Sequence, residues 1–290
     1  MKSRSRKVFA PDPVGAHALS PTTDLFQRAP RLLVGVLHLR PLPGSPRWNG
    51  SMDEVIEAAV ADARAYARGG VHAICIENFG DIPFGSGSVG PETVAAMAVV
   101  AVAVRRAVSV PVGFNVLRND ARAALALCAA CGGSFVRVNV HVGAMLTDQG
   151  LIEGRAHETL RYRRAVAPGV AIWADVLVKH AVPLGDWKLE VAAWDTWKRG
   201  LADALILSGV ATGQPADPAD LERLRTACPG ARILIGSGVT PENLARYGAA
   251  DGFLVGTSLK ENGQVDQPVD VRRVRALVRA LETLPPPGRR

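Results

Sequence analysis

From Leu32 onwards, one pattern occurs eight times: a short apolar run followed by a segment whose apolar residues have helical spacing. The expected strands are 32–37, 73–76, 110–116, 135–140, 170–178, 204–207, 233–235 and 252–255. The expected helices are 52–68, 91–107, 120–131, 156–166, 189–198, 218–227, 241–247 and 269–281. Strand–helix alternation predicts an α/β fold with a parallel sheet, and eight units in about 250 residues predict a single closed (β/α)8 TIM barrel. A doubly wound open sheet is the alternative, but no Gly-x-Gly-x-x-Gly follows the first run.

The two ends of the chain differ in composition from the barrel segment, 32–284. Residues 1–31 hold six Lys and Arg against two Asp, which is +4 of the net charge of +7, and their prolines predict an irregular leader. The basic tail 285–290 adds +2, which leaves +1 for the barrel segment. That segment is therefore nearly neutral, and it carries no basic stripe interleaved with aromatic residues. We expect no specific nucleic-acid partner.

Hydropathy and cysteine usage narrow the class of protein further. The longest uncharged apolar run, 94–104, is too short to cross a bilayer, and the basic N-terminus lacks the apolar stretch of a signal peptide. We expect a cytoplasmic protein with at most a peripheral membrane contact through its leader. Cys128 and Cys131 form a Cys-x-x-Cys in an Ala-rich helical segment without a second pair, which favours helix packing over a zinc or redox site. His38, His141 and His180 lack the close spacing of metal ligands, so we expect neither metal nor cofactor.

Two apolar runs near the C-terminus end in glycine and hydroxyl residues. Thr240 and Pro241 then suggest a helix N-cap followed by proline in the first turn. Free N–H groups at such turns and at helix N-termini attract a dianion, and (β/α)8 barrels hold phosphate after strands seven and eight. Two ordinary glycine turns are the alternative. The predicted phosphate-binding residues are Gly236, Ser237, Gly238, Gly256, Thr257 and Ser258.

Polar side chains are expected to point into the barrel near the C-terminal ends of four successive strands, because side chains alternate along a strand. They are Glu77, Asn115, Arg137 with Asn139, and Asp175. An unpaired buried charge costs several kcal/mol, so the three charged residues either form a self-satisfied ion-pair network or serve a ligand. We expect Glu77 and Asp175 to act as acid and base.

Lys179 and His180 follow the fifth strand and are expected to be charge or proton partners in catalysis. Four extended residues span roughly 13 Å, so Lys179 approaches Asp175 only if the chain folds back. Otherwise Lys179 reaches the substrate from the loop or is a solvated cation. The residues expected to bind substrate are His38, Asn115, Arg137, Asn139 and Ser208.

Three loops at the same face are longer than a connection requires: 38–46, 78–87 and 141–154. The third is long enough to form either a lid or a contact in a homo-oligomer. Its sequence favours neither.

Several of these segments together resemble the BtpA/SgcQ family, over roughly residues 32–282. The matching segments are 36–45, 137–140, Gly143-Ala-Met with Thr147-Asp-Gln-Gly150 and Ile152-Glu-Gly154, 174–180, and Gly236-Ser-Gly-Val-Thr-Pro-Glu-Asn243. The resemblance implies a ribulose-phosphate-binding type of barrel. The family takes its name from a factor needed for photosystem I biogenesis and associated with thylakoid membranes, whereas other members resemble sugar-metabolism proteins. The basic leader departs from the family pattern.

Two hypotheses of function follow. The first is an enzyme acting on a small phosphorylated metabolite, a sugar or nucleoside phosphate, by isomerase, lyase or glycosyl-transfer chemistry with carboxylate acid and base groups. The second is a non-catalytic, membrane-associated photosystem I biogenesis or assembly factor. A screen for activity on phosphorylated sugars and nucleosides separates the two.

Overall fold

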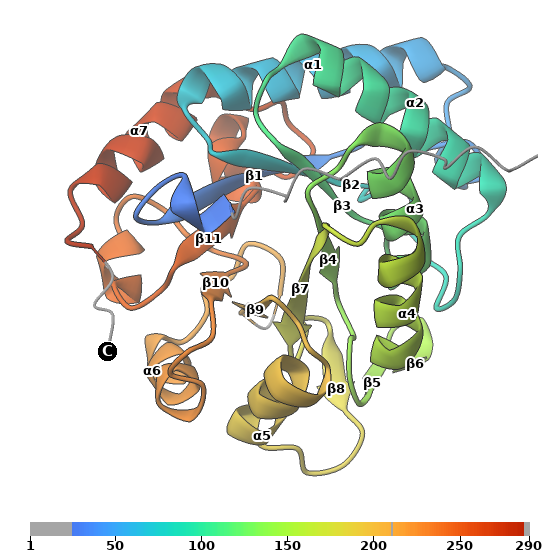
Figure 1. Cartoon of the computed structure of the whole chain (residues 1–290). Coiled ribbons are helices and arrows are strands. Elements are labelled where there is room, and N and C mark those ends of the chain that lie inside the picture. The colour runs from blue at the N-terminus through green and yellow to red at the C-terminus, as the bar shows by residue number, and fades with distance from the viewer. Residues whose placement is uncertain (1–24, 210, 287–290) are drawn as a thin grey trace, which may run out of the picture.

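The computed structural model describes residues 25–209 and 211–286. Most of the expected leader and the end of the expected tail lie outside the described residues. Eight parallel strands close into a barrel in the order β1-β11-β10-β9-β7-β4-β3-β2, and helices surround it (Figure 1). The strands are β1 (Leu32–His38), β2 (Ala73–Glu77), β3 (Val112–Asn115), β4 (Phe135–Val138), β7 (Ala171–Val176), β9 (Ala204–Leu207), β10 (Ile233–Ile235) and β11 (Gly252–Val255). The predicted TIM barrel is confirmed.

The outer helices begin and end largely where their capping residues indicate. They are α1 (Met52–Gly69), α2 (Pro91–Ala107), α3 (Ala121–Cys131), α4 (Ala156–Val166), α5 (Leu189–Trp194), α6 (Pro218–Ala227) and α7 (Val271–Glu282). The Ser51 side chain accepts a hydrogen bond from the Glu54 N–H at the start of α1, and Gly70 ends that helix with a φ of 99°. After α5 the chain continues as the π-helical segment η2 (Asp195–Arg199).

The prediction of a helix over 241–247 with Thr240 as its N-cap is wrong. Only a short 3-10 segment, η3 (Leu244–Tyr247), forms there. The Asn243 side chain accepts from the Thr240 N–H at 2.9 Å and donates to the Gly238 carbonyl at 2.8 Å, so it fixes the loop that precedes this segment. Any anion site after β10 therefore depends on loop N–H groups, because no α-helix dipole is present.

Two apolar layers confirm the predicted alternation of side chains. Ile74 and Ile76 of β2 belong to the layer between strands and helices, whereas Cys75 belongs to the barrel interior. Cys128 is buried in α3 and donates a weak hydrogen bond to the Phe135 carbonyl, as expected for helix packing.

Residues at the end of the expected leader close the N-terminal end of the barrel. The 3-10 segment η1 (Leu25–Gln27) places Leu25 in the interior cluster, and the Phe26 ring lies 5.8 Å from that of Trp173. Trp173 in turn stacks on Phe135 with ring centroids 3.9 Å apart. This end of the barrel is thus packed with aromatic side chains, as a structural layer.

The long loop 141–154 forms a small sheet beside the barrel. Strands β5 (Ala144–Thr147) and β6 (Gly150–Glu153) pair antiparallel and are joined by β8 (Ala181–Pro183), in the order β6-β5-β8. Met145 and Ile152 face inward, while Leu146 opposes Leu151 and Val182 on an outer face that is about half exposed. Whether this sheet is a lid or an oligomer contact stays a prediction.

No helix in the described parts of the chain has the length and hydrophobicity needed to cross a membrane.

Candidate functional site at the C-terminal end of the barrel

A cavity of about 270 Å³ opens among the loops that follow the barrel strands. Side chains at the ends of β1, β2 and β4 reach it, together with a lysine after β7 and the glycine loops after β10 and β11. The predicted residues that line it are His38, Glu77, Arg137, Lys179, Gly236, Ser237, Gly238, Gly256, Thr257 and Ser258. Predictions made from separate segments thus converge on one cavity.

Asp175 holds Arg137 in a bidentate ion pair under this cavity. Arg137 donates from Nε and Nη2 to the two carboxylate oxygens, each at 2.8 Å. Asn139 donates a further hydrogen bond to Oδ2 of Asp175, and Ser208 donates one to Oδ1, both at 3.1 Å. The Asp175 side chain is fully buried. With four donors around two oxygens, Asp175 fixes the guanidinium and has little capacity left for a ligand.

Glu77 is held much less tightly than Asp175. Arg137 Nη1 lies 3.8 Å from Glu77 Oε2, and this oxygen has no hydrogen-bond partner among the described residues. Burial raises the pKa of the Glu77 carboxyl, and Arg137 and Lys179 partly oppose that rise. A buried carboxyl with a free oxygen at a cavity is suited to proton transfer.

The chain folds back after β7. This is the condition under which Lys179 was expected to approach Asp175. Leu177 and His180 have positive φ values of 49° and 56°. Arg118 fixes the turn by donating to the Lys179 carbonyl at 2.7 Å. The Lys179 amine lines the cavity, and burial together with nearby Arg137 lowers its pKa to about 8.

Five predicted site residues, Asp175 among them, lie outside the cavity lining. His180 is exposed and pairs with Thr212 Oγ1 at 3.0 Å on the rim. Asn115 donates to the Arg137 carbonyl and to Asn139 Oδ1, both at 3.0 Å. Asn115, Asn139 and Ser208 therefore support the Arg137–Asp175 pair, and the structure does not bring them to the cavity surface.

His38 lies between the two sides of the cavity, at the end of β1. Its ring packs 4.5 Å from that of Phe79, and its Nδ1 has no hydrogen-bond partner within the described residues. Burial, followed by the charges of Lys260 and Lys179, lowers the pKa of His38 well below its ordinary value. The imidazole is therefore neutral at neutral pH, so it can donate or accept one hydrogen bond without adding charge.

The serine hydroxyl groups of the glycine loops form hydrogen bonds with the protein backbone. Ser237 Oγ accepts from the Gly209 N–H and donates to the Gln214 carbonyl, and Ser258 Oγ donates to the Val239 carbonyl. Within residues 25–209 and 211–286, the backbone N–H groups of Ser237, Gly238, Thr257 and Ser258 donate to no protein acceptor. These four donors belong to two loops that line the same cavity.

Glycine is required at position 238 on two grounds. Its φ is 66°, and a Cβ there would lie 2.2 Å from the backbone nitrogen of Pro215.

Three polar or charged residues in or near this site were not predicted from the sequence. Arg273 in the first turn of α7 lines the cavity, and its Nη1 donates to the Ser258 carbonyl at 3.3 Å. Thr212 lines the rim, and Arg118 lies close enough to influence Glu77 electrostatically. Arg118 follows the third strand closely, so its position was an available signal. Nothing in the sequence separates Arg273 from the other arginines of its helix.

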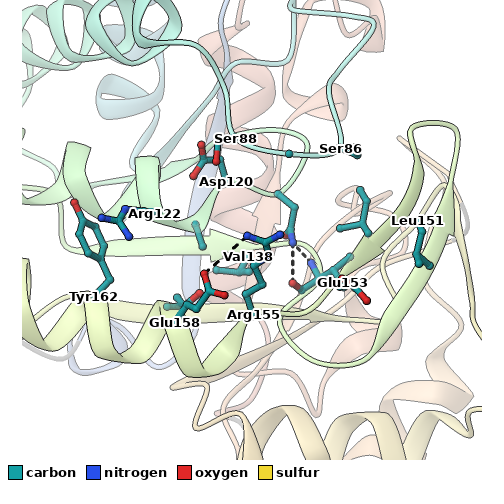
Figure 2. A pocket seen from close by; sticks show the side chains of 16 residues that line it. Ser86, Ser88, Asp120, Arg122, Val138, Leu151, Glu153, Arg155, Glu158 and Tyr162 are labelled. Atoms are coloured by element: carbon teal, nitrogen blue, oxygen red, sulfur yellow. Dashed lines mark hydrogen bonds and ion pairs between the residues drawn. The ribbon is translucent and has the colours of Figure 1, made fainter.

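A second hollow, of about 220 Å³, lies outside the barrel between α3, α4 and β6 (Figure 2). Its charged side chains are largely paired: Arg155 is directed at Glu158, and the Arg122 guanidinium lies 4.3 Å from the Tyr162 ring centroid (Figure 2). None of the predicted site residues lines it. The cavity at the barrel mouth is therefore the stronger candidate for the functional site.

The described ranges contain no group of three or more His, Cys, Asp or Glu side chains placed to hold a metal ion.

Comparison with known proteins places the chain in a family. The model of the BtpA family matches residues 29–283. The chain belongs to the BtpA family. It is 49% identical to the photosystem I biogenesis protein BtpA of Synechocystis, over 89% of this chain and 91% of that protein. A relative from Pyrococcus furiosus, described only as an uncharacterized protein, is 46% identical, over 89% of this chain and 97% of its own length.

Solved structures confirm the barrel fold. Phosphoribosyl anthranilate isomerase from Thermus thermophilus superimposes with a TM-score of 0.54, covering 88% of this chain and all of the isomerase. Its sequence identity is 17%, so the likeness shows the shared fold alone. The likeness confirms the predicted (β/α)8 barrel fold for this BtpA-family chain.

Proposed function

We propose that this protein is an enzyme acting on a small phosphorylated metabolite, a sugar or nucleoside phosphate, by isomerase, lyase or glycosyl-transfer chemistry. One observation carries the proposal: a single cavity is lined both by two glycine loops with unused N–H groups and by Glu77, Arg137 and Lys179. A ligand held by its phosphate at the loops would present its other end to the charged groups. Binding and proton transfer would then occur in the same cavity.

The glycine loops are the proposed phosphate site. Unused backbone donors on neighbouring strand ends form a concave array that suits a dianion, and the absence of a side chain at Gly238 lets its loop pack against the backbone of Gln214 and Pro215. Arg273 at the edge of the cavity adds a positive charge. These loops follow β10 and β11, the seventh and eighth strands of the barrel in chain order, where barrels of this class bind phosphate.

Glu77 is the proposed proton-transfer group, and Asp175 has a supporting role. Asp175 accepts four hydrogen bonds and orients Arg137, whereas Glu77 lines the cavity and its buried Oε2 has no hydrogen-bond partner in the described structure. Burial raises the pKa of Glu77, so the carboxyl can act as an acid nearer neutral pH. Arg137 then stabilises the anion that remains after proton transfer.

Thermal melting with inorganic phosphate and a panel of sugar phosphates tests the phosphate site. A ligand at a hundredfold excess over its dissociation constant stabilises the folded state by about 2.7 kcal/mol. T257E places a negative charge between the loops and should remove this stabilisation. T257Q has the same size without the charge and is the matched control, which should respond to the ligands. Equal responses of T257E and the parent would show that phosphate binds elsewhere.

A second candidate function is a non-catalytic biogenesis or assembly factor that retains the ligand site. The 49% identity to a protein named for photosystem I biogenesis favours it. A screen of phosphorylated sugars and nucleosides for turnover distinguishes the two. Stabilisation by a sugar phosphate without turnover in the whole panel would favour the second candidate.

A further inference from the structure

Lys179 differs from the other lysines that the structure describes. The chain contains six lysines, of which Lys2 and Lys7 lie outside the described residues. Lys188 and Lys198 are exposed, and Lys260 is bound to Asp62 and to the Gln267 carbonyl. Among the described lysines, Lys179 alone lines the cavity at the barrel mouth.

The Lys179 amine has no partner that would keep it charged and fixed. No hydrogen bond or ion pair engages its Nζ among the described residues, while its carbonyl is fixed by Arg118. Burial and the neighbouring charge of Arg137 lower its pKa to about 8, so a sizeable neutral fraction exists near neutral pH. A desolvated neutral amine next to other cations is the usual form of a nucleophilic lysine.

We propose that Lys179 is a nucleophile that forms an imine with the carbonyl carbon of a phosphorylated aldehyde or ketone bound in this cavity. The inference rests on the proposed function, because the glycine loops would hold the phosphate while the carbonyl meets Lys179. It narrows the substrate class from phosphorylated metabolites in general to those with a free carbonyl group.

The step balances with groups that line the cavity. Nζ adds to the carbonyl carbon, and one of its protons moves to the carbonyl oxygen to give a carbinolamine. The protonated Glu77 carboxyl then gives its proton to the hydroxyl group, water leaves, and the nitrogen lone pair forms the C=N bond. The products are a protonated imine, one water molecule and the Glu77 carboxylate, which Arg137 and the new cation stabilise.

Reductive trapping on the full-length protein tests this inference. The probe is pyridoxal 5′-phosphate, an aldehyde that carries a phosphate, followed by borohydride and mass mapping of the lysine peptides. We expect Lys179 to be labelled about tenfold or more faster than the exposed Lys188 and Lys198, because the phosphate site would hold the aldehyde in the cavity that Lys179 lines. Its labelling rate should level off above pH about 8. Glycerol 3-phosphate, which has no carbonyl, should slow labelling at Lys179 only.

The controls separate this inference from the proposed function. K179R keeps a cation but forms no stable imine, so the mutant should lose label at this position and keep it at Lys188 and Lys198. Suppose that glycerol 3-phosphate stabilises the protein but neither pyridoxal 5′-phosphate nor the smaller glycolaldehyde phosphate labels Lys179. That result overturns the imine and keeps the phosphate site. No stabilisation and no label at Lys179 would overturn both.

Discussion

The two sides of the barrel mouth differ in how the polar groups at their strand ends are hydrogen-bonded. On the side of β2, β4 and β7, charged side chains bind one another, and Asp175 is saturated by Arg137, Asn139 and Ser208. On the side of β10 and β11, side-chain hydroxyls hold the loops, and backbone N–H groups are left without protein acceptors.

The difference suggests that one side of the site suits ligand binding and the other suits chemistry. Backbone donors in glycine loops are fixed in place and keep their partial charge at any ordinary pH, so they suit binding of an anion. Titratable side chains change protonation, so they suit chemistry, provided that one of them stays free. On the charged side, Glu77 Oε2 and Lys179 Nζ belong to titratable groups and have no protein hydrogen bond within the described residues.

The sharpest test of this division is E77Q, which removes the acid function and keeps the shape. Turnover of a substrate found in the screen should fall by about 10²–10⁴, because Glu77 is the proposed proton-transfer group. Stabilisation by phosphate should persist, since the glycine loops are unchanged. E57Q, at an exposed position on α1, is the control and should leave turnover intact. Loss of phosphate binding in E77Q would contradict the separation of the two sides.

D175N should affect stability more than chemistry. Replacing the carboxylate leaves Arg137 buried with only a distant Glu77, and breaking a buried pair costs about 3–5 kcal/mol in the free energy of unfolding. Denaturant unfolding measures this loss, with D186N at an exposed loop position as the control. Stability close to that of the parent would show that Asp175 is not the anchor of the charged side.

K179M should remove a pH dependence of stability. The folded pKa of Lys179 is about 8, below the ordinary 10.5, so between these values the unfolded state binds more protons. The free energy of unfolding of the parent should therefore gain an upward contribution from pH 8 to 10.5. Denaturant titrations across this range should show a shallower rise for K179M. Parallel curves would mean that the amine is not desolvated in the folded state.

The smallest expected effect is that of S208A, which removes one of four hydrogen bonds to Asp175. The loss in the free energy of unfolding should be about 1 kcal/mol, because Asn139 and Arg137 still satisfy the carboxylate. Thermal melting measures it. A loss as large as that of D175N would show that the four donors act as one cooperative unit.

Much of this architecture was predictable because it follows from local periodicity. The spacing of Ile74, Cys75 and Ile76 determines which side of β2 faces the helices, and the same alternation turns Glu77 inward. The glycine and hydroxyl residues that follow β10 and β11 could likewise be recognised from the local sequence as candidate phosphate-binding loops. Local rules failed after Thr240, where only the short 3-10 segment η3 forms in place of the expected helix.

The sequence by itself determined the barrel and the inward direction of the polar residues. It also determined that the two glycine loops lie at the same end of the barrel. Only the tertiary structure decided which carboxylate is saturated and which is free. Asp175 gains its donors from residues 33 to 38 positions away on neighbouring strands, and Lys179 reaches the cavity through a turn set by two positive φ angles. Such pairings depend on strand register and on the distances between side chains. The spacing of apolar residues along the sequence gives neither of them.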